Sequence, residues 1–172
     1  MMKVAGALLI LGTTTIWGIK KAEKYKSKLE HMKYLQRILT LIQSEIRYSR
    51  SFMGEIFGGV GQNAKEPYRS WLLHMSKRLE EFTGESFEHI WRSSIDKYLN
   101  VLELPTDEMD RFKVLGNQLG FSDIQVQMRL IDLYQEQLER TIGEMQEQMQ
   151  TKVRLCHCMG VMSGLFIAVL LF

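Results

Sequence analysis

The chain has 172 residues, of which 22 are basic and 20 acidic, so its formal net charge is +2. This length suits one modest domain, and so balanced a charge argues against a general nucleic-acid binder, which needs an excess of Lys and Arg. The two cysteines lie close together near the C-terminus, so no disulfide framework is expected.

Residues 4–19 form the first recognisable element, because they carry no charge and are bracketed by Lys3 and Lys20. As a helix, this stretch reaches about 24 Å, and the flanking lysines can extend their side chains to the lipid headgroups. We therefore predict a transmembrane helix at 4–19. A secretory signal peptide is the alternative, but the residues before Lys20 offer no small-x-small cleavage site.

The helix that begins in this span is predicted to continue to about Arg50, because apolar residues recur every three or four positions along it. One seam of the helix would therefore be buried over roughly 45 Å. The members of this seam are Tyr25, Met32, Leu35, Leu39, Ile42 and Ile46.

Four shorter helices are predicted between residues 52 and 120, where no run alternates with the period of a strand. The first, around 52–57, is expected to stop at the glycine-rich stretch 58–61. The second begins at Pro67, which suits the first turn of a helix, and ends at Gly84. Ser86 can cap the third, and the fourth begins at Pro105 and stops at Gly120. The apolar residues predicted to point inward are Trp71, Leu72, Met75, Leu79 and Phe82 in the second, Phe87, Ile90, Trp91, Ile95 and Tyr98 in the third, and Met109, Phe112, Leu115 and Leu119 in the fourth.

The last helix is predicted to begin at a capping box of Ser122 and Gln125 and to run some 50 residues to the end of the chain. Its final part, residues 155–172, has no charged residue and would span about 27 Å, which predicts a second transmembrane helix. A buried core helix is the alternative, but such a helix normally keeps one polar face. Along this helix, one seam would pack against the first helix, and the polar residues on its other face would be in solvent. The seam residues are Met128, Ile131, Leu138, Ile142, Met145, Met149 and Cys156, and the solvent-facing residues are Glu136, Gln137, Glu144, Glu147 and Gln148.

Basic residues beside the two predicted spans indicate the orientation, because Lys and Arg favour the cytoplasmic side of a membrane. Seven basic residues and only two acidic ones lie between positions 20 and 37, and two further basic residues precede the second span. We therefore predict a membrane hairpin in which residues 20–154 are a cytoplasmic helical bundle and both termini lie outside. The residues expected to set this topology are Lys20, Lys21, Lys24, Lys152 and Arg154.

No residues have the spacing of a catalytic, cofactor-binding or metal site. The glycine-rich stretch 58–61 lacks the Lys-Ser/Thr of a phosphate loop, and Cys156 and Cys158, two positions apart on a helix, cannot readily bind one metal ion. The histidines of the middle region lie on separate predicted helices, without a nearby Ser or Cys that would form a nucleophile pair. We therefore expect a protein that is not an enzyme and uses no cofactor.

Small residues four positions apart in each predicted span offer a face on which membrane helices can approach closely. Gly160 and Gly164 form such a pair in the second span, and Thr14 and Gly18 form a weaker one in the first. We expect these residues to pack the spans against each other or against neighbouring subunits. The alternative is that these are ordinary small residues of a span, since the spacing also arises by chance.

Three short motifs mark helix ends. The first predicted helix ends with Glu45-Ile-Arg-Tyr48, and the helix that begins at Pro105 ends with Leu115-Gly116 and Leu119-Gly120. The last helix opens with Asp123 and Gln127. Together with the chain length and the terminal spans, these motifs resemble the stage III sporulation protein AB family over essentially the whole chain. Phe52-Met53-Gly54 departs from the family pattern, in which a Pro-containing turn and a better helix former are expected.

The resemblance implies an all-α fold, already indicated by the helical spacing: a six-helix bundle of the kind found in the type II secretion platform protein (the F component), flanked by transmembrane helices. It also implies a noncatalytic platform of the complex that connects mother cell and forespore, in the outer forespore membrane, with its bundle in the mother-cell cytoplasm. The implied partners are the ATPase and other subunits of that complex and the lipid bilayer, with a homo-oligomer as one arrangement and no nucleic acid. A membrane-anchored signalling or scaffold adaptor is the alternative, because a helical bundle does not fix a function.

Overall fold

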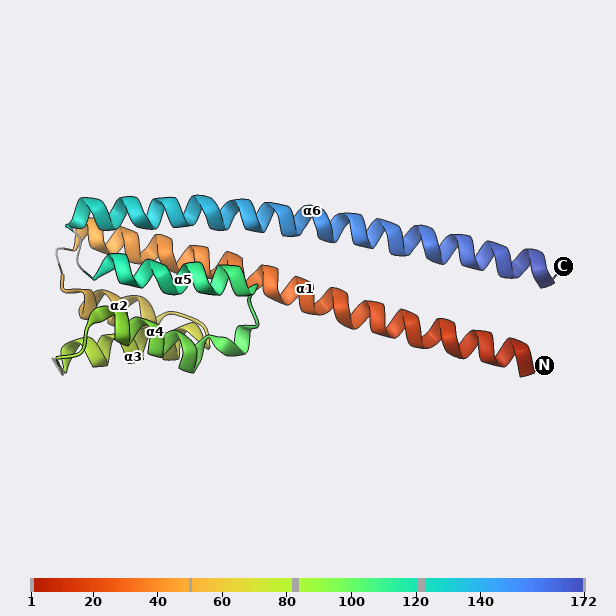
Figure 1. The fold of residues 1–172 in the computed structure, drawn as a ribbon, viewed down its shortest axis with the longest axis horizontal. Coiled ribbons are helices and arrows are strands. Elements are labelled where there is room, and N and C mark those ends of the chain that lie inside the picture. The colour runs from red at the N-terminus through yellow and green to blue at the C-terminus, as the bar shows by residue number, and fades with distance from the viewer. Residues whose placement is uncertain (1, 50, 82–83, 121–122, 172) are drawn as a thin grey trace. The chain divides into compact units, whose positions relative to one another are not determined.

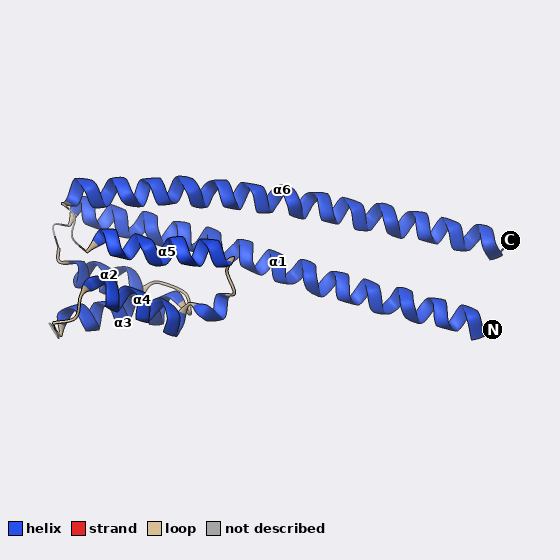
Figure 2. Cartoon of the chain, viewed as in Figure 1, coloured by secondary structure: helices blue, strands red, loops and turns tan. Residues whose placement is uncertain are grey.

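The computed structural model describes the backbone at residues 2–49, 51–81, 84–120 and 123–171, and the side chains at 23–49, 51–81, 84–120 and 123–151. Six α-helices and one short 3-10 helix make up this part of the chain, which contains no strand (Figure 1, Figure 2). The predicted all-α, six-helix fold is confirmed. In chain order, the elements are α1 (Met2–Tyr48), α2 (Met53–Gln62), α3 (Tyr68–Glu80), α4 (Phe87–Tyr98), η1 (Asn100–Leu102), α5 (Thr106–Leu119) and α6 (Ile124–Leu171).

The chain divides into two compact units. One holds residues 1–29 and 141–172, which include the larger N-terminal part of α1 and the larger C-terminal part of α6. The other, Glu30–Arg140, holds the rest of α1 and α6 together with all the shorter helices, and is called the bundle below. The predicted spans at 4–19 and 155–172 belong to the first unit, and their side chains lie outside the described residues. Among the residues that are described, no helix has a stretch long and apolar enough to cross a membrane.

The predicted seams of the two long helices are buried in large part. Met32, Leu35, Leu39, Ile42 and Ile46 of α1 are buried, whereas Tyr25 is half-buried. In α6, Ile131, Leu138 and Ile142 are buried, Met128, Met145 and Met149 are half-buried, and the five polar residues expected in solvent are exposed. This division follows from the helical period, which keeps residues three and four apart on one side.

Gln43 connects α1 to α6 inside the bundle. Its side-chain nitrogen donates hydrogen bonds to Asp132 Oδ1 at 2.5 Å and to the carbonyl oxygen of Met128 at 3.3 Å. A buried amide is costly unless it is paired, so this contact fixes the register of the two helices. The predicted packing of the first helix against the last is therefore present within the bundle.

The helix predicted around residues 52–57 was expected to stop at the glycine-rich stretch 58–61. This expectation is wrong, because α2 continues through that stretch to Gln62. Gly58 and Gly61 lie where α2 approaches α3, whereas Gly59 faces open space. A Cβ atom at Gly58 would lie 2.8 Å from Ser76 Oγ, and one at Gly61 would lie 3.0 Å from Leu72 Cβ. The missing side chains therefore permit a close helix contact and do not mark a turn.

Most of the remaining helix ends follow the predictions. The Ser86 hydroxyl accepts a hydrogen bond from the His89 N–H at 3.3 Å, α5 begins directly after Pro105, and α5 ends before Gly120. The helix predicted from Pro67 to Gly84 is α3, and it ends earlier, at Glu80. Phe82 and Ser122 lie outside the described residues. The predictions missed η1, which is followed by Glu103 in the left-handed region with φ of 47°.

Three aromatic side chains form the centre of the bundle. Trp91 of α4 lies with its ring centroid 5.2 Å from that of Trp71 in α3 and 5.0 Å from that of Phe112 in α5. The indole N–H of Trp91 also donates a hydrogen bond to the Phe112 carbonyl oxygen at 2.9 Å. Gly116 lies directly against this indole, because a Cβ atom at Gly116 would be 2.1 Å from Trp91 Cδ1.

We predict that Gly116→Ala destabilises the bundle by about 1–3 kcal/mol, because the added methyl group overlaps a fully buried indole that has no room to move. Thermal unfolding of the full chain in detergent, followed by near-ultraviolet circular dichroism, measures this change. Gly59→Ala is the matched control: a Cβ atom there meets nothing within 4 Å, and Ala favours a helix over Gly by up to about 1 kcal/mol. An unchanged stability in Gly116→Ala would contradict the close contact.

Candidate functional site

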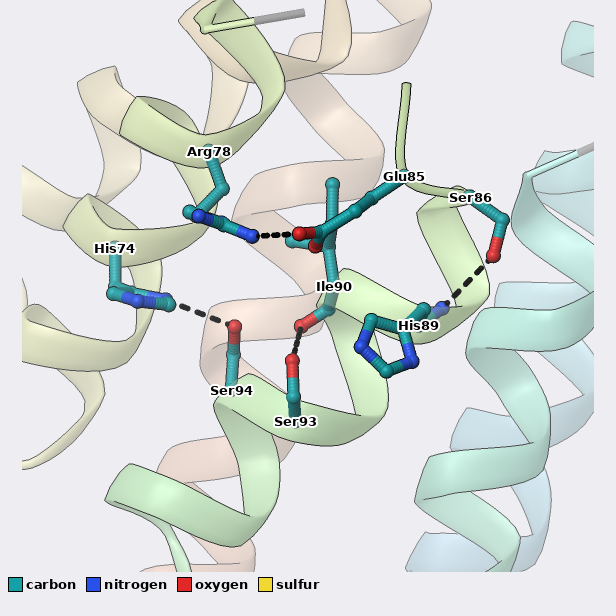
Figure 3. A network of polar contacts seen from close by, with 8 residues as sticks. All are labelled: His74, Arg78, Glu85, Ser86, His89, Ile90, Ser93 and Ser94. Carbon is teal, nitrogen blue, oxygen red and sulfur yellow. Dashed lines mark hydrogen bonds and ion pairs between the residues drawn. The ribbon is translucent and has the colours of Figure 1, made fainter. Parts of the chain in front are cut away.

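Polar side chains gather where α3 faces α4 (Figure 3). Arg78 of α3 forms an ion pair with Glu85, in the segment that precedes α4. His74 of α3 lies with Nδ1 3.0 Å from the hydroxyl oxygen of Ser94 in α4. The first contact joins α3 to the segment before α4, and the second joins α3 to α4 itself. The hydrogen bond with Arg78 lowers the pKa of Glu85, so the carboxylate form is the one that the pair favours.

The contact between His74 and Ser94 corrects the expectation that no histidine of the middle region has a nearby Ser. A His–Ser pair is also the first requirement of nucleophilic catalysis. Here, however, Ser94 is fully buried, with 0% of its surface exposed, so a substrate cannot reach its hydroxyl. We therefore interpret the pair as a stabilising contact between two helices.

Burial governs the protonation of two histidines. It lowers the pKa of His74 below the ordinary value of 6.5, and the positive charges of Lys97 and Arg78 lower it further. Burial also lowers the pKa of His31 in α1, against a smaller opposing effect of Glu30. Both histidines are therefore held in the neutral form at neutral pH.

A carboxylate is buried in the interior of the bundle. Glu108, in the first turn of α5, is 1% exposed, and its Oε2 lies 3.1 Å from Arg111 Nη1. Burial and the charge of Glu108 raise the pKa of Tyr134 in α6 well above its ordinary value. The carboxylate is compatible with burial because a cation and a helix N-terminus both lie beside it. Among the described side chains, no group of three or more His, Cys, Asp or Glu could hold a metal ion.

Exposed apolar side chains gather at one end of the bundle. Tyr48, the last residue of α1, and Phe52, in the connection to α2, are 77% and 84% exposed. Ile124 and Val126, in the first turn of α6, are 51% and 48% exposed. Figure 1 shows the end of α1, the beginning of α2 and the beginning of α6 at this same end. These four residues are called the end patch below.

The sequence analysis did not identify the end patch. The signal was present, since each of its residues lies outside the buried seams and next to a helix end, where polar residues are usual. Two of the sequence motifs named above, Glu45-Ile-Arg-Tyr48 and Asp123 with Gln127, lie at this end. These residue patterns supported a resemblance to a family, but they did not show which of the side chains would be exposed.

The structure leaves most of the predicted site residues untested. Thr14 and Gly18 lie in α1 and Gly160 and Gly164 in α6, but their surroundings are outside the described side chains, as are those of Lys20, Lys21, Lys152 and Arg154 and of Cys156 and Cys158. Lys24 is exposed on α1. The membrane-packing and topology roles of these residues remain predictions.

We predict that the bundle is less stable at pH 5.5 than at pH 7.5. Because the pKa of His74 is lower in the folded chain than in the unfolded chain, the unfolded chain binds more protons between the two values. The stabilisation is therefore complete above about pH 6.5 and decreases as the pH falls through that window. Denaturant unfolding at several pH values measures this effect.

His74→Gln should weaken this pH dependence, since Gln can still bond to Ser94 but cannot take up a proton. His89→Gln is the matched control because His89 is exposed on α4. A pH dependence that is identical in wild type and His74→Gln would show that His74 does not contribute.

Comparison with known proteins assigns the chain to a family. The sequence model of one family, described as Stage III sporulation protein AB (spore_III_AB), matches residues 3–172. Stage III sporulation protein AB of Bacillus subtilis (strain 168) is 23% identical over 171 residues, which are 99% of each chain. A solved structure of stage III sporulation protein AB (SpoIIIAB) is similar with a TM-score of 0.65 at 20% identity, over 72% of this chain and 97% of that one, which shows a common fold. The chain therefore belongs to the stage III sporulation protein AB family.

Proposed function

We propose that this sporulation-complex component is a noncatalytic platform in the membrane, with spans at 4–19 and 155–172 and a cytoplasmic bundle between them. In this function the bundle binds the cytoplasmic ATPase of the complex, and the spans bind its other membrane subunits. The proposal places the bundle in the mother-cell cytoplasm and the spans in the outer forespore membrane. Family membership supports a place in a sporulation complex.

The continuity of the two long helices carries the proposal. α1 has 47 residues and α6 has 48, and each runs without a break from the buried seam of the bundle to an uncharged stretch at one end of the chain. We infer that each helix, as one covalent segment with residues in both units, connects the bundle to the uncharged stretch. This is the arrangement expected of a protein that connects a cytoplasmic motor to membrane subunits.

Charge supports the proposed orientation. The basic residues between positions 20 and 37 follow the first uncharged stretch, and Lys152 and Arg154 precede the second. Such residues are attracted to anionic headgroups and resist transfer across the membrane. Both flanks therefore favour a cytoplasmic bundle with the two termini on the other side.

The topology can be tested with a reporter enzyme that is active only outside the cytoplasm. Fused after Phe172, the reporter should be active, because Lys152 and Arg154 keep the opposite flank of the second span inside. Inserted after Asn63, an exposed residue beyond α2, it should be inactive. An inactive C-terminal fusion of normal abundance would rule out the hairpin.

The platform role can be tested through the small residues of the second span. Replacing Gly160 and Gly164 by Leu should prevent close helix approach, while the span becomes more apolar and still inserts. Such contacts contribute on the order of 1 kcal/mol each, so assembly should weaken without loss of the bundle. The measurements are the co-purification of other subunits from sporulating cells and the spore yield, at matched protein abundance.

Gly143→Leu is the control for that experiment. Gly143 lies on the same helix, is exposed, and has open space where a Cβ atom would be. Assembly and spore yield should both be normal in this variant. Wild-type values in the Gly160→Leu, Gly164→Leu double variant would mean that neither glycine forms a packing face.

A further inference from the structure

We infer that Glu108, Arg111 and Tyr134 form a polar latch that holds the start of α5 against α6. These three residues are called the latch below. All of them belong to the bundle, so the latch is independent of the proposed function. Its closed state depends on one ionised carboxylate and not only on apolar packing.

The helices α5 and α6 form an antiparallel pair that the chain ties at one end only (Figure 1). At that end, residues 120–123 connect the two helices, and the Gln127 side-chain nitrogen donates a hydrogen bond to the Leu119 carbonyl oxygen at 2.7 Å. At the other end, α5 begins after Pro105 and the left-handed Glu103, and no short connection joins it to α6. Only side-chain contacts can therefore hold this end of the pair closed.

The sequence at the start of α5 turns a carboxylate inward. A Glu at the third helical position usually bonds back to the N–H of the residue that caps the helix. Pro105 occupies the cap position and has no N–H, and its carbonyl oxygen accepts hydrogen bonds from the N–H groups of Glu108 and Met109. The Glu108 side chain is instead 1% exposed. Its carboxylate therefore lies in the interior of the bundle and not on the surface of the helix.

The carboxylate lies beside a cation of its own helix and near a tyrosine of α6. Its Oε2 atom is 3.1 Å from Arg111 Nη1. One turn further along α5, the ring centroid of Phe112 is 5.8 Å from that of the buried Tyr134. Burial raises the pKa of Tyr134 well above its ordinary value, and the nearby charge of Glu108 raises it further. The charge thus acts across the contact between α5 and α6, where it favours the neutral phenol.

Tyr134 also marks one position along α6. The residues one turn before and one turn after it are Leu130 and Leu138, which carry no polar group. If α6 moved by one turn in either direction, a leucine would replace the hydroxyl near Glu108. The latch therefore favours one axial position of α6, which apolar packing alone distinguishes less sharply.

The closed latch depends on Arg111. A buried ion pair becomes strongly unfavourable when one partner is removed, because the remaining charge stays in surroundings of low polarity. The Arg111 side chain is 46% exposed, so it neutralises Glu108 from the surface of the bundle. Replacing Arg111 alone should therefore open the start of α5, whereas replacing both charged groups should not.

Hydrogen–deuterium exchange of the full chain in lipid nanodiscs, followed by mass spectrometry, tests the latch. In Arg111→Met, the backbone amides of residues 106–113 should exchange about tenfold faster or more than in wild type. The Glu108→Gln, Arg111→Met double variant should return most of the way to the wild-type rate, because it leaves no buried charge.

Lys113→Met is the matched control on the same helix. Lys113 Nζ lies 2.6 Å from Asp96 Oδ1, but the Asp96 side chain is 53% exposed. Loss of this lysine leaves the carboxylate in water, where it is not costly. The amides of residues 106–113 should therefore exchange in Lys113→Met as they do in wild type.

Tyr134→Phe tests whether the latch reaches α6. This variant removes only the hydroxyl and keeps the ring against Phe112, so the chain should fold even if Arg111→Met does not. Exchange of residues 106–113 should be faster than in wild type, by a smaller factor than in Arg111→Met, because the charge of Glu108 remains paired.

The outcomes distinguish a charged latch from apolar packing. Fast exchange in Arg111→Met that is reversed by adding Glu108→Gln supports the latch. Wild-type exchange in Arg111→Met, or no recovery in the double variant, would show that apolar packing alone holds the start of α5, and the latch would be wrong. Wild-type exchange in Tyr134→Phe would show that the carboxylate does not hold α6, which overturns the inference.

Discussion

The packing of Trp91 against Gly116 is the contact on which the interior of the bundle depends. The indole occupies the space that a side chain at Gly116 would fill, and its N–H bonds to the carbonyl of Phe112 one turn earlier. Both contacts are with α5, so α4 is held at a short distance and in one orientation. Trp71 brings α3 against the same indole. Three helices thus share one aromatic centre, and the polar contacts at their surfaces only refine its geometry.

The sequence predicted the helices well where burial follows the helical period. Most of the α1 seam, Trp91 of α4 and the predicted inward residues of α5 are buried, because hydrophobic burial acts at every third or fourth position. It failed at the glycines of α2, where the same residue type can end a helix or admit a close neighbour. The decisive atoms belong to α3, more than ten positions away, so no local pattern could separate the two cases.

The candidate sites were less predictable than the fold, for related reasons. His74 and Ser94 lie 20 positions apart and meet only because α3 and α4 pack side by side. The end patch depends on the register of α1 and α6, which a single buried amide helps to fix. By contrast, the membrane residues were predicted from composition and length alone, without any knowledge of contacts within the chain. That prediction concerns contact with lipid, whereas the His74–Ser94 contact and the end patch depend on packing within the bundle.

The glycines of α2 have a consequence for how this part of the bundle opens. Four of its ten residues are glycine, and each disfavours a helix by about 1 kcal/mol relative to alanine, while a helix this short is already marginal in water. α2 therefore has little helical stability of its own and depends on burial against α3. Separation from α3 and unwinding of α2 become a single event. The backbone amides of α2 should accordingly exchange with solvent as one cooperative group, at the rate at which the helix leaves its neighbour.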